Sequence, residues 1–556
     1  MKRYIFTLLF PVFSCLLVYA QPFNVKKASK AVLTLKTFKA DGTLLASSNA
    51  FFVGEEGCAL SSFTPFRGAD RAVVIDAQGK EWPVEAMLGA NETYDVAKFR
   101  VDVKKPQGLA VAQQTLSTGS EVWALPYLEV KKVPQGVVRR VEKFLGDNAY
   151  YTVALQMPET MGYCPLLNAE GAVVGLMQAP SSAADTLNYA VSACYADSLR
   201  ITGLSMNDRA LRSTNIKKAL PAELDQALLA MYIGVQSLDS AAYAVMVDDF
   251  IAAFPTSPDG YAYRAQLKVD ADDFKGAQQD MEQAISVADK KDEAHYNYAR
   301  LIYQKEVFKS QLPFEPWSYE KAFQEAGEAY ALNAQPIYRH LQAQIRYAQK
   351  QYDDAFAIYQ ELLGSSLRSA EMFFEASRCK EQLKDTTAQL ALLDSALAQF
   401  SRPLLQEAAP YLLARAQARL DAGKYREAAA DLNEYEPLMR SRLGANFYYI
   451  RYQAEVGGRL FKQALDDIQK AIDLLPQYDL YYAEKASLEV RVGLYDDAIA
   501  TARQCIDVAP DHSDGYLFLG LAQCLKGEKT EGIKHLQKAK ELGDEQADDL
   551  IAKYAQ

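Results

Sequence analysis

Small residues recur at steps of about 34 residues through the second half of this chain, and this period limits the possible folds more than any other feature. Another small residue lies twelve positions before most of them, and an aromatic residue usually lies three positions before. The recurring positions are Ala277, Ala322, Ala355, Ala388, Ala428, Ala464, Ala498 and Gly532. Because small side chains let two antiparallel helices approach closely, each step predicts one helical pair. Stacked pairs of this kind form a solenoid rather than one compact core.

The paired spacings resemble those of the tetratricopeptide repeat over roughly residues 225 to 545. Several successive units share both spacings, while the units near Tyr452 and Lys529 depart from the pattern. The resemblance implies an all-α solenoid, which we assign to residues 224–545. Residues 546–556 are expected to form a capping helix that covers the last apolar face.

The first half of the chain has a different period, with short alternating runs separated by turns. Ala31–Thr37 and Ala72–Ile75 are two of these runs. Several short strands at such spacing are typical of an all-β barrel or sandwich. We therefore assign residues 21–200 to a β domain and residues 201–223 to a linker.

Four segments of the β domain resemble the trypsin-like fold of secreted HtrA-type peptidases. In chain order they stand where that family has the strand before its histidine, the strand with its aspartate, the segment after its serine, and its closing strand. The segments are Ala50–Val53, Tyr94–Ala97, Pro165–Asn168 and Asn188–Val191. The resemblance implies an all-β trypsin-like double barrel over most of residues 27 to 195.

The same resemblance indicates which residues stand at the three catalytic positions of that family. Thr64 falls on the histidine, Asp95 on the aspartate and Gly162 on the serine. All 4 histidines lie at or beyond His295, so composition excludes a Ser-His-Asp or Cys-His arrangement within the β domain. An aspartate alone neither attacks a carbonyl nor relays a serine proton. We therefore expect a pseudo-peptidase without catalytic residues.

Two alternatives stay open for the β domain. A Ser-Lys dyad would make it a serine peptidase with rearranged catalytic residues, whose repeats select substrates. The former substrate cleft could instead bind peptides without cleaving them. Cys164 lies two positions after the lost serine and has no local base, so we expect a buried or disulfide-linked cysteine there.

The repeat resemblance places the second, fifth, ninth and twelfth residues of each first helix on a concave groove. The groove residues expected from this register are Tyr296, Arg300, Tyr303, His340, Gln344, Tyr347, Phe373, Tyr449 and Gln453. Tyrosine is enriched in binding hot spots because it combines a large contact area with a hydroxyl group. A peptide or an extended loop of a protein partner is the expected ligand. Helical periodicity leaves open that some of these tyrosines pack between repeats.

An insertion of roughly residues 305–317 interrupts the repeats and is rich in proline and aromatic residues. Such insertions usually lie outside the stack, which makes this one a second candidate contact surface. The alternative is a cap that packs back on its own repeats.

The N-terminus is typical of a secretory signal. Lys2 and Arg3 precede an apolar stretch from Tyr4 to Val18, and small residues flank a cleavage site before Gln21. The apolar run is shorter than the ~20 residues that span a membrane, so residues 1–20 are expected to be removed. Together with the peptidase resemblance, this predicts an exported protein of the periplasm or outer membrane, or a secreted one, with no transmembrane segment after cleavage.

Charge and cysteine content exclude several other functions. A net charge of -11 leaves no broad basic surface for nucleic acid. The sequence has no CxxC or zinc-ligand spacing, so we expect neither a metal nor another cofactor. Cys505 and Cys524 fall on helices that pack together, which makes a disulfide between them a hypothesis. The sequence as a whole predicts an exported, non-catalytic scaffold for a protein or peptide partner, with an envelope complex as one such partner.

Overall fold

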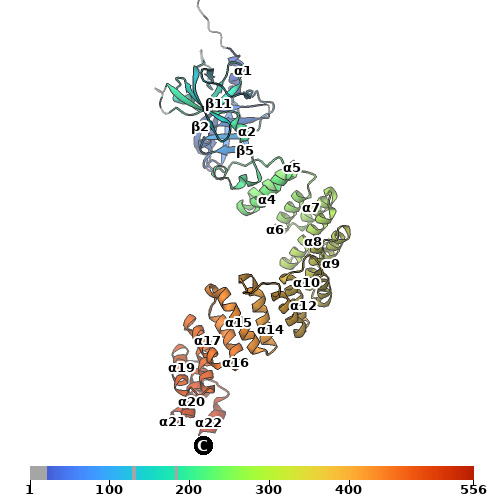
Figure 1. The fold of residues 1–556 in the computed structure, drawn as a ribbon, viewed down its shortest axis with the longest axis vertical. Coiled ribbons are helices and arrows are strands. Elements are labelled where there is room, and N and C mark those ends of the chain that lie inside the picture. The colour runs from blue at the N-terminus through green and yellow to red at the C-terminus, as the bar shows by residue number, and fades with distance from the viewer. Residues whose placement is uncertain (1–21, 55, 128–132, 181, 183–185, 556) are drawn as a thin grey trace, which may run out of the picture. The chain divides into compact units, whose positions relative to one another are not determined.

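The structure, a computed structural model, describes residues 22–555 apart from 55, 128–132, 181 and 183–185 (Figure 1). The expected signal, residues 1–20, lies outside the described residues. Tertiary contacts divide the chain into two compact units, residues 1–287 and residues 288–556.

The first unit begins with a closed antiparallel barrel whose strands follow the order β1-β2-β3-β6-β5-β4. Alternating burial along β1 sends Leu33 and Leu35 into the core, where Phe51, Phe66 and Phe99 also pack. The strands are β1 Val32–Phe38, β2 Leu44–Phe52, β3 Cys58–Ser61, β4 Arg71–Ile75, β5 Glu81–Asn91 and β6 Val96–Val101.

A second closed antiparallel barrel follows in the order β10-β11-β12-β9-β8-β7. Its core contains Val138, Tyr151, Val153 and Leu166. The strands are β7 Glu121–Ala124, β8 Gln135–Phe144, β9 Asn148–Ala154, β10 Pro165–Leu167, β11 Val173–Met177 and β12 Leu187–Ser192. The expected fold class, a double β-barrel followed by a helical array, is confirmed.

Residues 201–223 pack on the first barrel. The backbone N–H of Met87 on β5 donates to the carbonyl of Lys217 at 2.8 Å, and the N–H of Ala219 donates to the carbonyl of Met87 at 2.9 Å. Two short helices lie in this segment, η4 Gly203–Asn207 and α3 Arg209–Arg212. The stretch assigned to a linker is therefore hydrogen-bonded to β5.

The longer helices of the first unit follow this segment. They are α4 Leu224–Ser237, α5 Ser240–Ala253, α6 Pro258–Asp270 and α7 Phe274–Val287. Ala265 and Ala277 are both fully buried where α6 and α7 pack together, which is the close approach that their spacing predicts.

The second unit consists of antiparallel helical pairs. Its helices are α8 Lys291–Phe308, α9 Tyr319–Leu332, α10 Pro336–Ala348, α11 Tyr352–Leu362, α12 Ala370–Gln382, α13 Thr386–Leu397, α14 Ala409–Asp421, α15 Tyr425–Met439, α16 Ala445–Gly457, α17 Phe461–Leu474, α18 Asp479–Arg491, α19 Tyr495–Val508, α20 Ser513–Lys526, α21 Lys529–Glu541 and α22 Ala547–Tyr554. Helix α22 lies where the capping helix is expected, and Ala547 is buried with Leu536 of α21.

A left-handed residue occurs in the turn between the two helices of seven repeats, and in six of them it lies five positions before the recurring small residue. These residues are Asp272, Lys350, Lys384, Gly423, Arg459, Gly493 and Gly527. Counting five positions from Lys384 leads to Gln389, not to the expected Ala388. The repeat formed by α12 and α13 is therefore shifted by one residue from the register read in the sequence.

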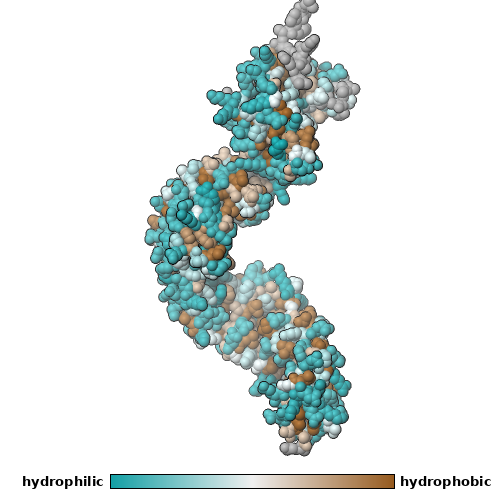
Figure 2. Space-filling model, turned by 180° about the vertical axis from the view of Figure 1, so that it is seen from behind, coloured by the Kyte–Doolittle hydropathy of each residue, from teal (hydrophilic) through white to brown (hydrophobic). Residues whose placement is uncertain are grey.

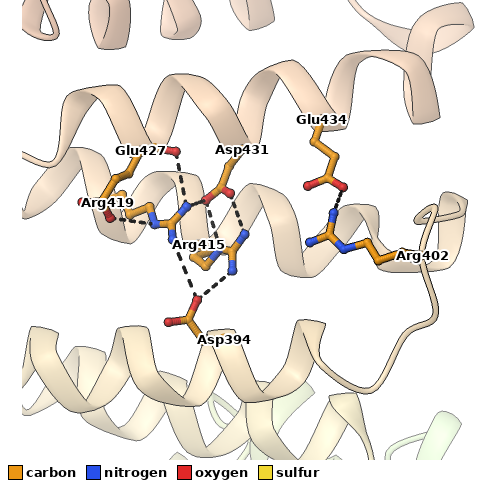
Figure 3. A network of polar contacts seen from close by, with 7 residues as sticks. All are labelled: Asp394, Arg402, Arg415, Arg419, Glu427, Asp431 and Glu434. Carbon is orange, nitrogen blue, oxygen red and sulfur yellow. Dashed lines mark hydrogen bonds and ion pairs between the residues drawn. The ribbon is translucent and has the colours of Figure 1, made fainter.

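Buried ion pairs join the two helices of several repeats. Arg415 of α14 binds Asp431 of α15 with two bonds, Nη2 to Oδ1 at 2.7 Å and Nε to Oδ2 at 3.1 Å (Figure 3). Arg419 Nη1 also donates to Asp431 Oδ2, at 2.6 Å, and Asp394 of α13 accepts from Arg415 Nη1 at 2.7 Å. Charge-assisted, bidentate pairs of this kind are geometrically specific, so they fix how α14 lies on α15.

The same bidentate pair occurs at the equivalent positions of two other repeats, as Arg264 with Asp280 and Arg451 with Asp467. The second of these repeats has a glutamate, Glu455, at the position that Arg419 holds in α14. Asp467 therefore lies near the carboxyl group of Glu455, whereas Asp431 in the equivalent position binds a second arginine, Arg419.

Candidate functional site

Asp95 lies in the turn between β5 and β6, in a left-handed backbone conformation with φ 49°. Its Oδ1 accepts three hydrogen bonds: from the N–H of Phe63 at 3.0 Å, and from the N–H and Oγ1 of Thr64 at 2.7 and 2.9 Å. The residues expected at the aspartate and histidine positions thus lie in direct contact.

Tyr163 supplies the fourth donor to this carboxylate, from the second barrel. Its hydroxyl donates to Asp95 Oδ2 at 3.0 Å, and burial together with the Asp95 charge raises the pKa of Tyr163 far above its usual value. Tyr163 also has a left-handed backbone, with φ 64°. Tyr163 directly follows Gly162, the residue at the expected serine position, and no sequence pattern indicated a role for it.

Gly162, at the serine position, is crowded by backbone. A Cβ added there would lie 3.0 Å from Ala179 Cα and 3.3 Å from Ala179 Cβ, closer than ordinary van der Waals contact. The side-chain amide of Asn49 on β2 donates to the carbonyls of Gly162 at 2.7 Å and Thr160 at 2.9 Å. These bonds hold the segment of the serine position against the first barrel.

The chemistry available around Asp95 is limited by its neighbours. Residues 1–287 contain no histidine, so no imidazole can serve as base there. Cys164 is fully buried, and burial raises the pKa of its thiol to about 12, which keeps the sulfur protonated at neutral pH. Ser62 is also fully buried, with Oγ 3.2 Å from Ser48 Oγ.

A polar, tyrosine-lined pocket of about 170 Å³ lies in the second unit. Three of the residues expected in the groove line it, Tyr303 of α8 and Gln344 and Tyr347 of α10. The remaining lining residues are Tyr359, Glu375 and Arg378. The pocket thus joins side chains of α8, α10, α11 and α12.

Glu375 is the best-bonded acceptor of this pocket. The Nε2 atom of His340 lies in a very short contact with Glu375 Oε2, and Gln344 Nε2 donates to Oε1 at 3.2 Å. Tyr359, which is buried, also hydrogen-bonds to Glu375, and burial with this carboxylate raises the pKa of Tyr359 far above its usual value. His340, Gln344 and Tyr359 together hold the carboxylate in one position.

The other expected groove residues lie outside this pocket. Tyr296 packs on Tyr338, with ring centroids 5.0 Å apart, and Phe373 is only 6% exposed. Tyr449 stacks between repeats, with centroids 5.9 Å from Tyr452 and 5.1 Å from Tyr481. The two remaining expected residues are exposed, Arg300 and Gln453.

Sequence reasoning missed Arg378 because of the one-residue register shift in α12, and it missed Glu375 because this residue stands outside the four groove positions in either register. In the corrected register, Arg378 of α12 takes the place that Gln344 has in α10, and Phe374 takes that of His340. The correct register could have been read from the left-handed turn between the two helices. Glycine occupies this turn position at Gly423 and Gly493, but here the residue is Lys384. A lysine there is not recognisable as a turn marker from sequence.

The insertion of residues 305–317 divides into a buried and an exposed part. Trp317 is 3% exposed and its indole Nε1 donates to the Tyr298 hydroxyl at 3.0 Å, which anchors the segment on α8. Phe308 is 77% exposed at the end of α8.

Within the described ranges, no three His, Cys, Asp or Glu residues lie close enough to hold a metal ion. No helix in the described part of the chain is long and apolar enough to cross a membrane. On the face drawn in Figure 2, apolar residues lie in small groups among hydrophilic ones. The described cysteines are free thiols, Cys505 and Cys524 among them, so the hypothesised disulfide does not form in this structure.

Comparison with known proteins identifies repeats in the second unit. Residues 484–547 match a family model described as tetratricopeptide repeat. The small glutamine-rich tetratricopeptide repeat-containing protein 2 of Saccharomyces cerevisiae is 26% identical to this chain over 91 residues, which make up 16% of this chain and 26% of the yeast protein. The chain thus matches about a quarter of the length of that relative.

Solved structures of HtrA-type proteases are similar to part of the chain. A variant of the HtrA-type protease AlgW, with a tripeptide, matches at a TM-score of 0.28 and 20% identity over 34% of this chain and 63% of that chain. AlgW with a decapeptide matches at a TM-score of 0.26 and 19% identity over 31% of this chain and 63% of that chain. This chain therefore spans less than two thirds of either. The topology of β1 to β12 is what defines the double-barrel fold.

Proposed function

We propose that this chain is an exported, non-catalytic scaffold that binds a protein or peptide partner through its helical repeats, with a pseudo-peptidase β domain. The observation that carries the proposal is the pocket of the second unit, where Tyr303, Gln344 and Tyr347 meet. These residues come from a register that was expected to face a ligand, and they enclose space for about one side chain. Tyrosine hydroxyls and an amide suit a polypeptide ligand, which offers both apolar surface and hydrogen-bonding groups.

Partner capture tests the binding role. The tagged protein is cross-linked and purified from its native cells, and wild type is compared with a Tyr303→Ala, Tyr347→Ala variant. We expect a discrete partner with the wild type and its loss with the variant. Tyr232→Ala is the matched control, because Tyr232 is 64% exposed on α4 of the other unit. A partner that the pocket variant retains in full would contradict the proposal, provided that both variants keep the wild-type unfolding midpoint.

The Asp95 carboxylate accepts hydrogen bonds at both oxygens, and this supports the non-catalytic role of the β domain. Thr64 and Tyr163 occupy both of its oxygens, and the serine position holds Gly162, where a larger side chain would press on Ala179. General base catalysis needs a group that takes the proton of the nucleophile. The hydroxyls of Thr64 and Tyr163 do not do so at neutral pH.

The competing function is a serine peptidase with rearranged catalytic residues. A fluorophosphonate probe separates the two, because it labels only an activated serine. We expect no serine of the β domain to be labelled under conditions that label trypsin fully. A labelled serine identified by mass spectrometry, with hydrolysis of a peptide library that its Ser→Ala variant abolishes, would replace our proposal.

Export rests on the sequence of the N-terminus. A signal cleaved before Gln21 directs the chain to the periplasm, to the outer membrane or out of the cell. An envelope complex is one partner of the expected kind. N-terminal sequencing of the protein from fractionated cells tests this. We expect Gln21 as the first residue in the exported fraction, and an intact Met1 in the cytosol would contradict export.

A further inference from the structure

The pocket of the second unit contains one cation whose donors have no acidic partner. Arg378 is exposed on α12, and its guanidinium lies 5.1 Å from the ring centroid of Tyr347. Among the residues that the structure describes, no carboxylate lies within ion-pair distance of Arg378. A cation–π contact with a tyrosine ring uses none of the five N–H donors of the guanidinium, so they stay available to a ligand.

The carboxylate that lines the pocket, Glu375, is already hydrogen-bonded. Glu375 receives bonds from His340, Gln344 and Tyr359, so most of its lone pairs are used. A cation entering the pocket would meet Arg378 and gain little from Glu375. An anion would meet the open guanidinium fork.

Two tyrosine hydroxyls add hydrogen-bond donors to those of Arg378. Tyr303 and Tyr347 line the same pocket as Arg378, and burial raises the pKa of both phenols, so they stay protonated donors at neutral pH. A guanidinium fork in a pocket that two neutral phenols also line matches a carboxylate, which has two planar acceptor oxygens. The small volume of the pocket fits one such group on a short side chain.

We propose that this pocket binds the carboxylate of an acidic residue, Asp or Glu, within the polypeptide that the solenoid recognises, with Arg378 as the residue that selects it. The inference rests on the proposed partner-binding function and specifies the chemistry of the partner. Arg378 binds the carboxylate in two parallel hydrogen bonds, while Tyr303 and Tyr347 exclude water from one side of the pair.

The test measures binding of heptapeptide pools to the full-length protein by fluorescence anisotropy. Each pool is acetylated and amidated, has randomised flanks, and carries a fixed central Glu, Gln or Lys. A further Gln pool carries a free C-terminal carboxylate. We expect the Glu pool to bind at least tenfold more tightly than the Gln and Lys pools, and Arg378→Gln to abolish that preference. Arg503→Gln, an equal charge change at an exposed residue of α19, should leave the preference unchanged.

Each other outcome either overturns the inference or shows that the bound carboxylate is a chain end rather than a side chain. A Glu preference that survives in Arg378→Gln, a stronger Lys pool, or equal binding of Glu and Gln would overturn it. Preference for the pool with a free C-terminus alone would assign the pocket to a chain end rather than a side chain. Binding to no pool would also overturn it, while partner capture by the wild type decides the proposed function separately.

Discussion

Glu455 gives the sharpest test of how charge is arranged inside the repeats. Its side chain on α16 is 2% exposed, and its Oε2 has no hydrogen-bond partner. Burial, with the nearby charge of Asp467 as the second cause, raises the pKa of Glu455 to about 8. Asp467 is itself held by the buried Arg451 through Nε to Oδ2 at 2.5 Å and Nη2 to Oδ1 at 2.9 Å. Arg451 is therefore already used by Asp467, so Glu455 is mostly protonated in the folded solenoid at neutral pH.

The expected magnitude follows from the two pKa values of Glu455. Its pKa is raised on folding from 4.5 to about 8, so its stabilising effect is complete below pH 4.5 and is lost as the pH rises to 8. At about 1.4 kcal/mol per pH unit, this loss reaches about 3 kcal/mol at pH 7. Glu455→Gln keeps the shape and stays neutral, so we expect it to stabilise α16 and α17 by about that amount at pH 7 and by almost nothing at pH 4.

Hydrogen exchange read by mass spectrometry on peptides of α16 and α17 measures this locally, which suits a repeat array that need not unfold in one step. The protein is compared with Glu455→Gln from pH 4 to pH 9. Glu407→Gln, a change at an exposed residue, is the control and should have no pH-dependent effect. A destabilised Glu455→Gln at pH 7, or a difference that does not vary with pH, would refute the reasoning.

Three further predictions concern unfolding free energies, each followed by denaturant or thermal melts. Tyr163→Phe removes the hydroxyl bond to Asp95 and should cost about 2 kcal/mol, and a neutral result would mean that this bond contributes nothing net. Gly162→Ser should destabilise by about 1 kcal/mol or more because its Cβ crowds Ala179, and combined with Thr64→His it should restore no hydrolysis. Asp431→Ala should cost about 3 kcal/mol because two arginines lose their shared partner, and wild-type stability would show the network to be dispensable.

Much of the architecture could be predicted from the sequence because it depends on local periodicity. The steps between Ala355, Ala428 and Ala464 specify close helix contacts, and each of these alanines is fully buried. The strand pattern likewise predicted an all-β barrel or sandwich, since alternation along β1 directly reflects which face is buried, while the second barrel was implied only by the peptidase resemblance.

The details of both sites depended on contacts between distant residues. Nothing near Tyr163 in the sequence indicates that its hydroxyl reaches Asp95, 68 positions away in the chain, across the two barrels. In the solenoid, Ala388 stands one position before the place that the left-handed turn at Lys384 defines, and reading the register from this alanine hid Arg378. A shift of one residue turns a helix face by about 100°, which is enough to replace a pocket residue with a buried one.

Site-specific photo-crosslinking in the native cells tests the central claim, that the solenoid pocket is where the partner binds. A benzoylphenylalanine is introduced at Gln344, which lines the pocket, and in separate variants at Arg503 and at Tyr189 of the β domain, which are exposed. Our account predicts a discrete adduct from position 344 and none from the other two. An adduct from Tyr189 without one from Gln344 would contradict it and assign binding to the β domain.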